Sequence, residues 1–114
     1  MPNQLASIML GTADPDRLRD WYRRAFAPKE DEYGWMDFGG CGLLIDGRDD
    51  VPAHNDHPGR VILNFHVDDA RAVVEHLDRM GVTWVVRLDR RDHGVFSTLR
   101  DPDGNYLQVI EFDK

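Results

Sequence analysis

Apolar and polar positions in the first part of the chain predict a strand followed by a helix. Leu5–Leu10 is short and mostly apolar, which is typical of a buried strand. Asp14 and Pro15 then favour a helix start, because the carboxylate caps free amides and proline suits the first helical turn. Pro28 ends this helix. Its apolar residues recur at helical spacing: Leu18, Trp21, Tyr22 and Phe26.

A hairpin and a long connection follow. Trp35–Phe38 and Cys41–Ile45 flank Gly39–Gly40, a pair that permits positive φ at both turn positions and predicts a β-hairpin. Glu30–Tyr33, before the hairpin, is expected to be a polar connection. Asp46–Arg60, after it, is rich in Pro, Gly, Asp and His, which predicts a surface linker.

The second half of the chain repeats the pattern. Val61–Val67 predicts a strand, Asp69 a helix cap and Gly81 the end of that helix. Arg87–Asp92 alternates in charge and predicts a solvated loop, and Asp101–Asn105 predicts a turn. Three more strands are expected, at Val82–Leu88, Val95–Leu99 and Tyr106–Phe112.

The order β-α-β-β-β is therefore expected twice, with strands starting in matching places at Ser7 and Ile62. Each half is too small to stand alone, so we predict one α+β domain over residues 1–114. Module one covers about residues 1–47, a linker about 48–59, and module two about 60–114. Twist would curl the eight strands into one concave sheet with the helices outside.

Composition narrows the function classes. Of 114 residues, 41% are apolar and the net charge is −7, which argues against a general nucleic-acid partner. No apolar run is long enough to cross a bilayer and no signal peptide is recognisable, so we expect a cytoplasmic protein without a membrane partner. Cys41 is the only cysteine, which excludes an intrachain disulfide.

Three segments together resemble the vicinal oxygen chelate superfamily, which includes glyoxalase I, bleomycin-resistance proteins and extradiol dioxygenases. Asp101–Gln108 resembles the end of these proteins. The Trp21–Tyr22 pair resembles their first module, and Val67–Asp69 resembles their second strand-to-helix junction. The resemblance covers almost the whole chain and implies paired βαβββ modules, a small organic ligand and a homodimer.

The resemblance also implies where a metal would be held. Metal-using members bind a divalent cation through four side chains, usually His and Glu, and the matching positions here are Ser7, Leu44, Ile62 and Gln108. Such cations require imidazole, thiolate or carboxylate donors. A slip of one residue gives only other non-ligands: Ala6 or Ile8, Leu43 or Ile45, and Leu63. We therefore predict no metal and no cofactor at these positions.

If these four positions face inwards, strand alternation defines a mixed inner face and an apolar outer face. Trp35 and Trp84 are expected at the rim of the inner face, where their rings would add stacking surface. Asn64 and Gln108 either contact a ligand or bond each other or water, and His66 is either functional or a solvent-exposed strand-end residue. The predicted ligand-binding residues are Ser7, Met9, Trp35, Leu44, Ile62, Asn64, His66, Tyr106 and Gln108.

Three functions stay open at this point. The first is a metal-independent small-molecule binding protein of the bleomycin-resistance type, for which the net charge favours cationic or neutral ligands. The second is a lyase, isomerase or dioxygenase that uses unusual metal ligands (Asp46, His54, His57 or His66) or metal-free proton transfer by His66 or Tyr106. The third is an interaction module with a vestigial pocket.

Overall fold

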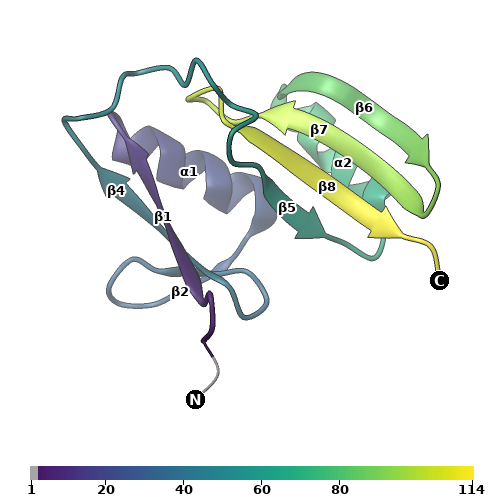
Figure 1. Ribbon diagram of the computed structural model, residues 1–114, viewed down its shortest axis with the longest axis horizontal. Coiled ribbons are helices and arrows are strands. Elements are labelled where there is room, and N and C mark those ends of the chain that lie inside the picture. The colour runs from purple at the N-terminus through teal and green to yellow at the C-terminus, as the bar shows by residue number, and fades with distance from the viewer. Residues whose placement is uncertain (1–2) are drawn as a thin grey trace. The chain divides into compact units, whose positions relative to one another are not determined.

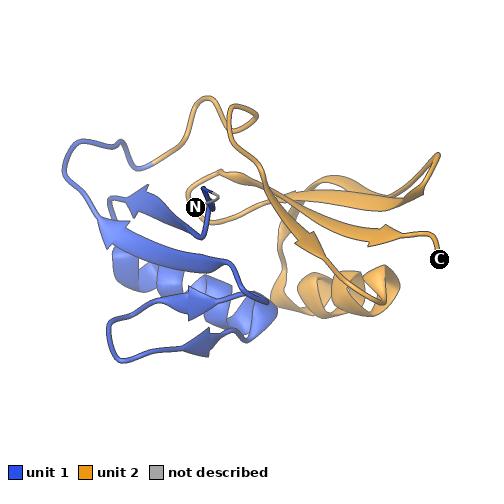
Figure 2. Cartoon of the chain, turned by 60° about the horizontal axis from the view of Figure 1, so that its bottom comes forward, with its two compact units in different colours: residues 1–53 blue, residues 54–114 orange. Residues whose placement is uncertain are grey.

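A computed structural model describes residues 3–114, which divide after residue 53 into two compact units (Figure 2). Each unit has one helix and four strands in the order βαβββ (Figure 1). The predicted α+β class and the repeated module are confirmed, and the eight strands divide into two four-stranded mixed sheets.

The first unit builds one sheet beside one helix. Its elements are β1 (Ser7–Thr12), α1 (Pro15–Phe26), β2 (Lys29–Glu30), β3 (Met36–Asp37) and β4 (Gly42–Gly47), and the strand order is β1-β4-β3-β2. β1 runs parallel to β4, and the other neighbours are antiparallel.

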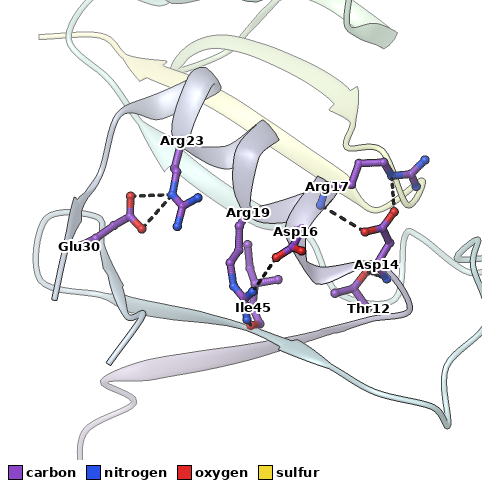
Figure 3. Close-up of polar contacts among 8 residues, drawn as sticks. All are labelled: Thr12, Asp14, Asp16, Arg17, Arg19, Arg23, Glu30 and Ile45. Atoms are coloured by element: carbon purple, nitrogen blue, oxygen red, sulfur yellow. Dashed lines mark hydrogen bonds and ion pairs between the residues drawn. The ribbon is translucent and has the colours of Figure 1, made fainter. Parts of the chain in front are cut away.

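Helix α1 packs its apolar residues against this sheet, and polar side chains beside them also bond to the sheet. Leu18 and Tyr22 on the helix are fully buried, and Leu43 and Ile45 on the sheet are 3% and 1% exposed. Burying a Leu or Ile side chain stabilises the folded state by about 1.5–3 kcal/mol. Asp14 Oδ1 accepts the Arg17 backbone N–H at 3.3 Å, as the predicted cap requires. Figure 3 shows these contacts, among them Arg19 donating to the Ile45 carbonyl at 3.0 Å and Arg23 donating to Glu30 at 2.9 Å.

The second unit repeats the plan with longer strands. Its elements are β5 (Leu63–His66), α2 (Ala70–Met80), β6 (Thr83–Arg91), β7 (Gly94–Arg100) and β8 (Tyr106–Phe112), in the strand order β5-β8-β7-β6. Asp69 accepts the Ala72 N–H at 3.1 Å and Gly81 ends α2 at φ +76°, so both predicted helix boundaries are confirmed. The core between α2 and the sheet contains Val74, Leu77, Leu99, Leu107 and Val109.

The turn between β7 and β8 is fixed by one buried carboxylate. Asp101, 4% exposed, accepts the backbone N–H groups of Asp103 and Asn105 at 2.9 and 3.0 Å. Asn55 donates to the Asn105 side chain at 2.8 Å, and its own N–H donates to the Asp103 carbonyl at 2.8 Å. The end of the predicted linker is therefore attached to this turn.

Two strand predictions are wrong. Asp89–Arg91, predicted within the loop Arg87–Asp92, continues β6 beyond the predicted strand Val82–Leu88, and Asp89 pairs with Phe96 and Arg91 with Gly94. Alternating charge suits an exposed edge strand as well as a loop, because charges on an edge prevent further pairing. Lys29–Glu30 forms the short edge strand β2, although Glu30 was placed in a polar connection.

Within the described residues, neither helix has the length and apolar character that a bilayer crossing demands.

Candidate functional site

Each sheet has one face covered by its helix and one face that the helix leaves uncovered, here called the helix-free face. In the first unit, β1 and β4 pair Ser7 with Gly42 and Met9 with Leu44. The intervening residues, Leu43 and Ile45, are buried in the core with α1. Ser7, Met9 and Leu44 therefore share the helix-free face, and Met9 is 58% exposed there.

Trp35 also lies on this face. A Cβ built on Gly42 would be 3.3 Å from Trp35 Cε3, so the indole covers the glycine and depends on its missing side chain. Asp31 Oδ1 accepts the Trp35 N–H at 3.0 Å and so fixes the turn that carries the ring. A pocket of about 350 Å³ adjoins it, lined by Lys29, Glu30, Asp31, Trp35, Met36, Asp37 and Gly42.

The helix-free face of the second sheet has neutral polar groups across its middle. Asn64 is opposite Gln108, and Gln108 is opposite Thr98. Gln108 Nε2 donates to Thr98 Oγ1 at 3.2 Å, so the amide is bonded to β7 rather than to Asn64. Among the described residues, Gln108 Oε1 has no such partner.

One end of this face is positively charged. The Arg100 guanidinium lies 4.9 Å from the centre of the Tyr106 ring, and its Nη2 donates to the Tyr106 hydroxyl at 3.3 Å. The sequence predictions contain Tyr106 but not Arg100. Alternation along β7 from Thr98 would have placed Arg100 on the same face.

The opposite end of this face is aromatic. The His66 and Phe112 rings are 5.0 Å apart, and the Phe96 and Phe112 rings are 5.9 Å apart, both edge to face. The Arg91 guanidinium lies 4.7 Å from the Phe96 ring centre. A pocket of about 470 Å³ opens here, lined by Arg91, Asp92, His93, Phe96 and Phe112. Of this group, only His66 was predicted; extending the Tyr106–Ile110 alternation by one step would have included Phe112.

Ile62 and Trp84 are the two remaining predicted positions, and only Trp84 lies elsewhere than predicted. Ile62 precedes β5 and is 36% exposed. Trp84 does not lie at the rim of the helix-free face, because its Nε1 donates to Asp78 Oδ1 on α2 at 2.8 Å. The prediction for Trp84 is therefore wrong.

The Arg87 guanidinium, and secondarily the Trp84 indole N–H, lower the pKa of the Asp78 carboxyl from its ordinary value.

The sequence profile of the glyoxalase-like domain matches residues 7–110. The chain belongs to this family. The resemblance to the vicinal oxygen chelate superfamily is thereby confirmed. No protein of curated function matches this glyoxalase-like chain at a significant level.

Solved structures with the same fold come from several bacteria. A protein from the mobile metagenome of V. Pseudocholerae, VPC_CASS1, is 21% identical with a TM-score of 0.79, and the match covers 100% of this chain and 98% of that chain. A glyoxalase/bleomycin resistance protein/dioxygenase family enzyme from Burkholderia phytofirmans PsJN is 17% identical with a TM-score of 0.80, over 97% and 100% of the two chains. A glyoxalase-related enzyme from Fulvimarina pelagi is 21% identical with a TM-score of 0.75, over 96% and 88%.

The donor chemistry of this glyoxalase-like domain does not fit the metal that the family's metal-using members hold. Leu44 and Ile62 have no donor atoms, and the Gln108 amide is neutral and bonded to Thr98. No group of three or more His, Cys, Asp or Glu residues with metal-site geometry occurs in residues 3–114. His54 Nδ1 instead lies 3.1 Å from the Asn55 carbonyl.

Proposed function

We propose that this glyoxalase-like protein is a metal-independent small-molecule binding protein that sequesters an organic ligand, as bleomycin-resistance proteins do. The observation that carries the proposal is the position of Gln108. Where metal-using relatives have a Glu ligand, a neutral amide bonds Thr98 and leaves Oε1 to accept a hydrogen bond. An organic ligand with an N–H or O–H group satisfies that oxygen, whereas a divalent cation requires charged or imidazole donors.

The surroundings of Gln108 support the same function. Tyr106, which is half-buried, is its neighbour along β8 on the same face, and Asn64, which is exposed, is its neighbour across the sheet. Ile110 and Thr98 share this face but are only 2% and 7% exposed, so the groups that a ligand can reach are Tyr106, Gln108 and Asn64. Apolar area with a few hydrogen-bonding groups is typical of small-molecule sites. The corresponding face of the first unit has, by itself, Trp35 beside a pocket of about 350 Å³.

Binding by protein prepared in a chelator tests this proposal. Isothermal titration and native mass spectrometry across aromatic amines, aromatic acids and neutral heterocycles are expected to find at least one saturable ligand that EDTA does not displace. Gln108→Leu is expected to weaken that ligand about fivefold, the effect of one hydrogen bond of about 1 kcal/mol. Gln4→Leu, at the other glutamine, which is exposed, is the matched control and is expected to leave binding unchanged.

Elemental analysis separates this proposal from the enzyme alternative. Protein purified without chelator is expected to contain no stoichiometric Ni, Zn, Fe or Mn. A stoichiometric metal whose removal abolishes ligand binding contradicts the proposal and favours a metal-dependent lyase, isomerase or dioxygenase. Absence of binding across the whole panel also contradicts it.

The homodimer and the cytoplasmic location belong to the same proposal, and the resemblance supports the homodimer. Light scattering is expected to give twice the chain mass of 13.1 kDa.

A further inference from the structure

We propose, on the basis of the small-molecule function above, that the ligand is an elongated aromatic acid, bound along the strands of the second sheet. Its carboxylate contacts Arg100 and its aromatic end contacts Phe96 and Phe112. Three observations carry this inference: the surroundings of Arg100, the order of side chains along the sheet, and the aromatic pocket.

Arg100 differs from the other arginines of the described chain. In residues 3–114, eight arginines have a carboxylate within 4.0 Å: Arg17, Arg19, Arg23, Arg24, Arg48, Arg87, Arg90 and Arg91. The other arginines without one are exposed: Arg60, Arg71 and Arg79. Arg100 is half-buried on a sheet face, and its contacts are the ring and hydroxyl of Tyr106.

These surroundings favour an anion. The guanidinium is always charged, and neither a π-face nor a phenol neutralises it. A planar carboxylate matches its parallel N–H groups and forms two hydrogen bonds at once. The Tyr106 ring holds the guanidinium in place, which reduces the conformational entropy that binding would cost.

The strand register places different chemistry at successive steps along one face. Arg100 pairs with Tyr106, Thr98 with Gln108, Phe96 with Ile110, and Gly94 with Phe112. The face therefore changes from cationic through neutral polar to aromatic. Thr98 and Ile110 are buried, so the ligand contacts the middle of the face through the partly exposed Gln108. Arg100 and Phe96 are four residues apart, which is about 13 Å at roughly 3.3 Å per residue. A ligand that contacts both ends is about that long.

The aromatic end suits an apolar ring rather than a second charge. The Phe96 and Phe112 rings are edge to face, and Phe112 is 47% exposed. Arg91, over Phe96, is already paired with Asp89 at 2.9 Å and offers no free charge. The pocket of about 470 Å³ at this end is open to solvent, and both phenylalanine rings line it.

Local charge here opposes the charge of the whole chain. The net charge of −7 predicts a preference for cations or neutral molecules on encounter. Two carboxylates lie near the aromatic end: Asp89, which is paired with Arg91, and Asp92, which lines the aromatic pocket. At the Arg100 end no carboxylate is bonded to the guanidinium. Because salt screens distant charges more than a contact pair, the local positive charge decides which ligand stays bound.

The test compares a biphenyl carboxylate with its primary amide and its aminomethyl analogue, by isothermal titration. Wild-type protein is expected to bind the carboxylate at least tenfold more tightly than the amide, and the amine most weakly. Raising NaCl about tenfold is expected to weaken the carboxylate severalfold and to leave the amide unchanged. Equal or tighter binding of the amine or amide overturns the inference.

Variants assign the effect to each end. Arg100→Met is expected to remove the preference for carboxylate over amide while the amide affinity stays within twofold, and Arg100→Lys is expected to keep part of it. Phe112→Ala is expected to weaken acid and amide equally. Arg71→Met, at an exposed position on α2, is the matched control. Should Arg100→Met fail to fold by circular dichroism, Arg100→Lys and the salt dependence of wild type give the same decision.

The two proposals fail separately. If none of the three probes binds but another member of the wider panel does, the aromatic-acid inference is overturned and the small-molecule function stands. If neither the probes nor the panel bind, both are overturned.

Discussion

Gly104 shows how one residue sets the turn that precedes β8. It has φ +85°, and a Cβ there would lie 2.8 Å from His54 Cε1. Two constraints therefore coincide, a left-handed backbone and the close approach of an imidazole ring. Gly81 has a similar φ of +76° but nothing within 4 Å, so it carries only the first constraint.

Gly104→Ala is expected to lower the free energy of unfolding by more than Gly81→Ala, which is expected to cost about 1 kcal/mol for the backbone alone. Urea denaturation of both variants measures the difference. Adding His54→Ala to Gly104→Ala is expected to recover part of the loss, because the ring no longer opposes the methyl group. Equal losses for the two alanine variants would show that His54 does not constrain the turn.

The sequence predicted two residues in the middle of the candidate site and one at each of its ends. Asn64, His66, Tyr106 and Gln108 followed from alternation along strands whose core face is uniformly apolar. Arg100 was missed because it lies directly before a turn, where a charged side chain is expected to point into solvent. Phe112 was missed because the alternation was not continued to the end of its strand.

At the level of elements, the helix boundaries followed from local chemistry alone. Asp14, Asp69 and Gly81 cap the helices where predicted, because each cap depends on a few neighbouring backbone groups. Strand β6 was not predictable in the same way. Its pairing with β7 shifts twice, near Trp84 and Val86, and such irregularities break the alternation that assigns a side chain to one face. Trp84 consequently faces α2.

Asp69→Ala is expected to cost about 1 kcal/mol of stability, because the first turn of α2 loses its cap. Thermal or urea unfolding measures it. Asp68→Ala is the matched control, since Asp68 is exposed and lies outside the cap, and is expected to change stability by less than about 0.5 kcal/mol. Equal effects would show that charge near the helix start matters more than the cap bond.

The contact between α2 and β6 is expected to depend on pH. Arg87 and Trp84 lower the pKa of Asp78 below its ordinary 3.8, so the folded state binds a proton less readily than the unfolded state. The resulting stability is fully present above pH 3.8 and is lost as pH falls through the lowered value. Urea midpoints of wild type and Asp78→Asn are therefore expected to differ most at neutral pH and to converge in acid.

Arg87→Gln is expected to remove most of the same pH dependence, because Arg87 is the main cause of the lowered pKa. A wild-type decline in acid that survives both substitutions would assign the effect to other carboxylates.

Across the whole molecule, two copies of one plan carry different surfaces. The helix-free face of the first unit combines Met9 and Leu44 with Trp35, while that of the second combines charge, amides and aromatic rings. The duplication was predictable because the spacing of apolar residues predicts the same order of strands and helix in each half of the chain. The division of the strands between two sheets was not, since it depends on which strand edges pair.

Treatment with a chelator is expected to leave the melting temperature of the protein unchanged. A ligand that binds only the folded state raises the melting temperature by mass action, so a resident metal would reveal itself on chelation. Differential scanning calorimetry with and without EDTA is expected to give the same Tm, and added Zn²⁺ or Ni²⁺ is expected not to raise it. A reproducible rise with one of these ions would contradict the metal-independent function.

The bonds of Asn55 to the turn at Asp103 and Asn105 have a consequence for how the protein is dissected. The repeat in the sequence begins near residue 60, whereas the cohesive unit begins at His54. A gene fragment cut at the start of the repeat would strip the turn of its Asn55 partner, while one cut six codons earlier would retain it. The repeated sequence segment and the compact structural unit thus begin at different residues.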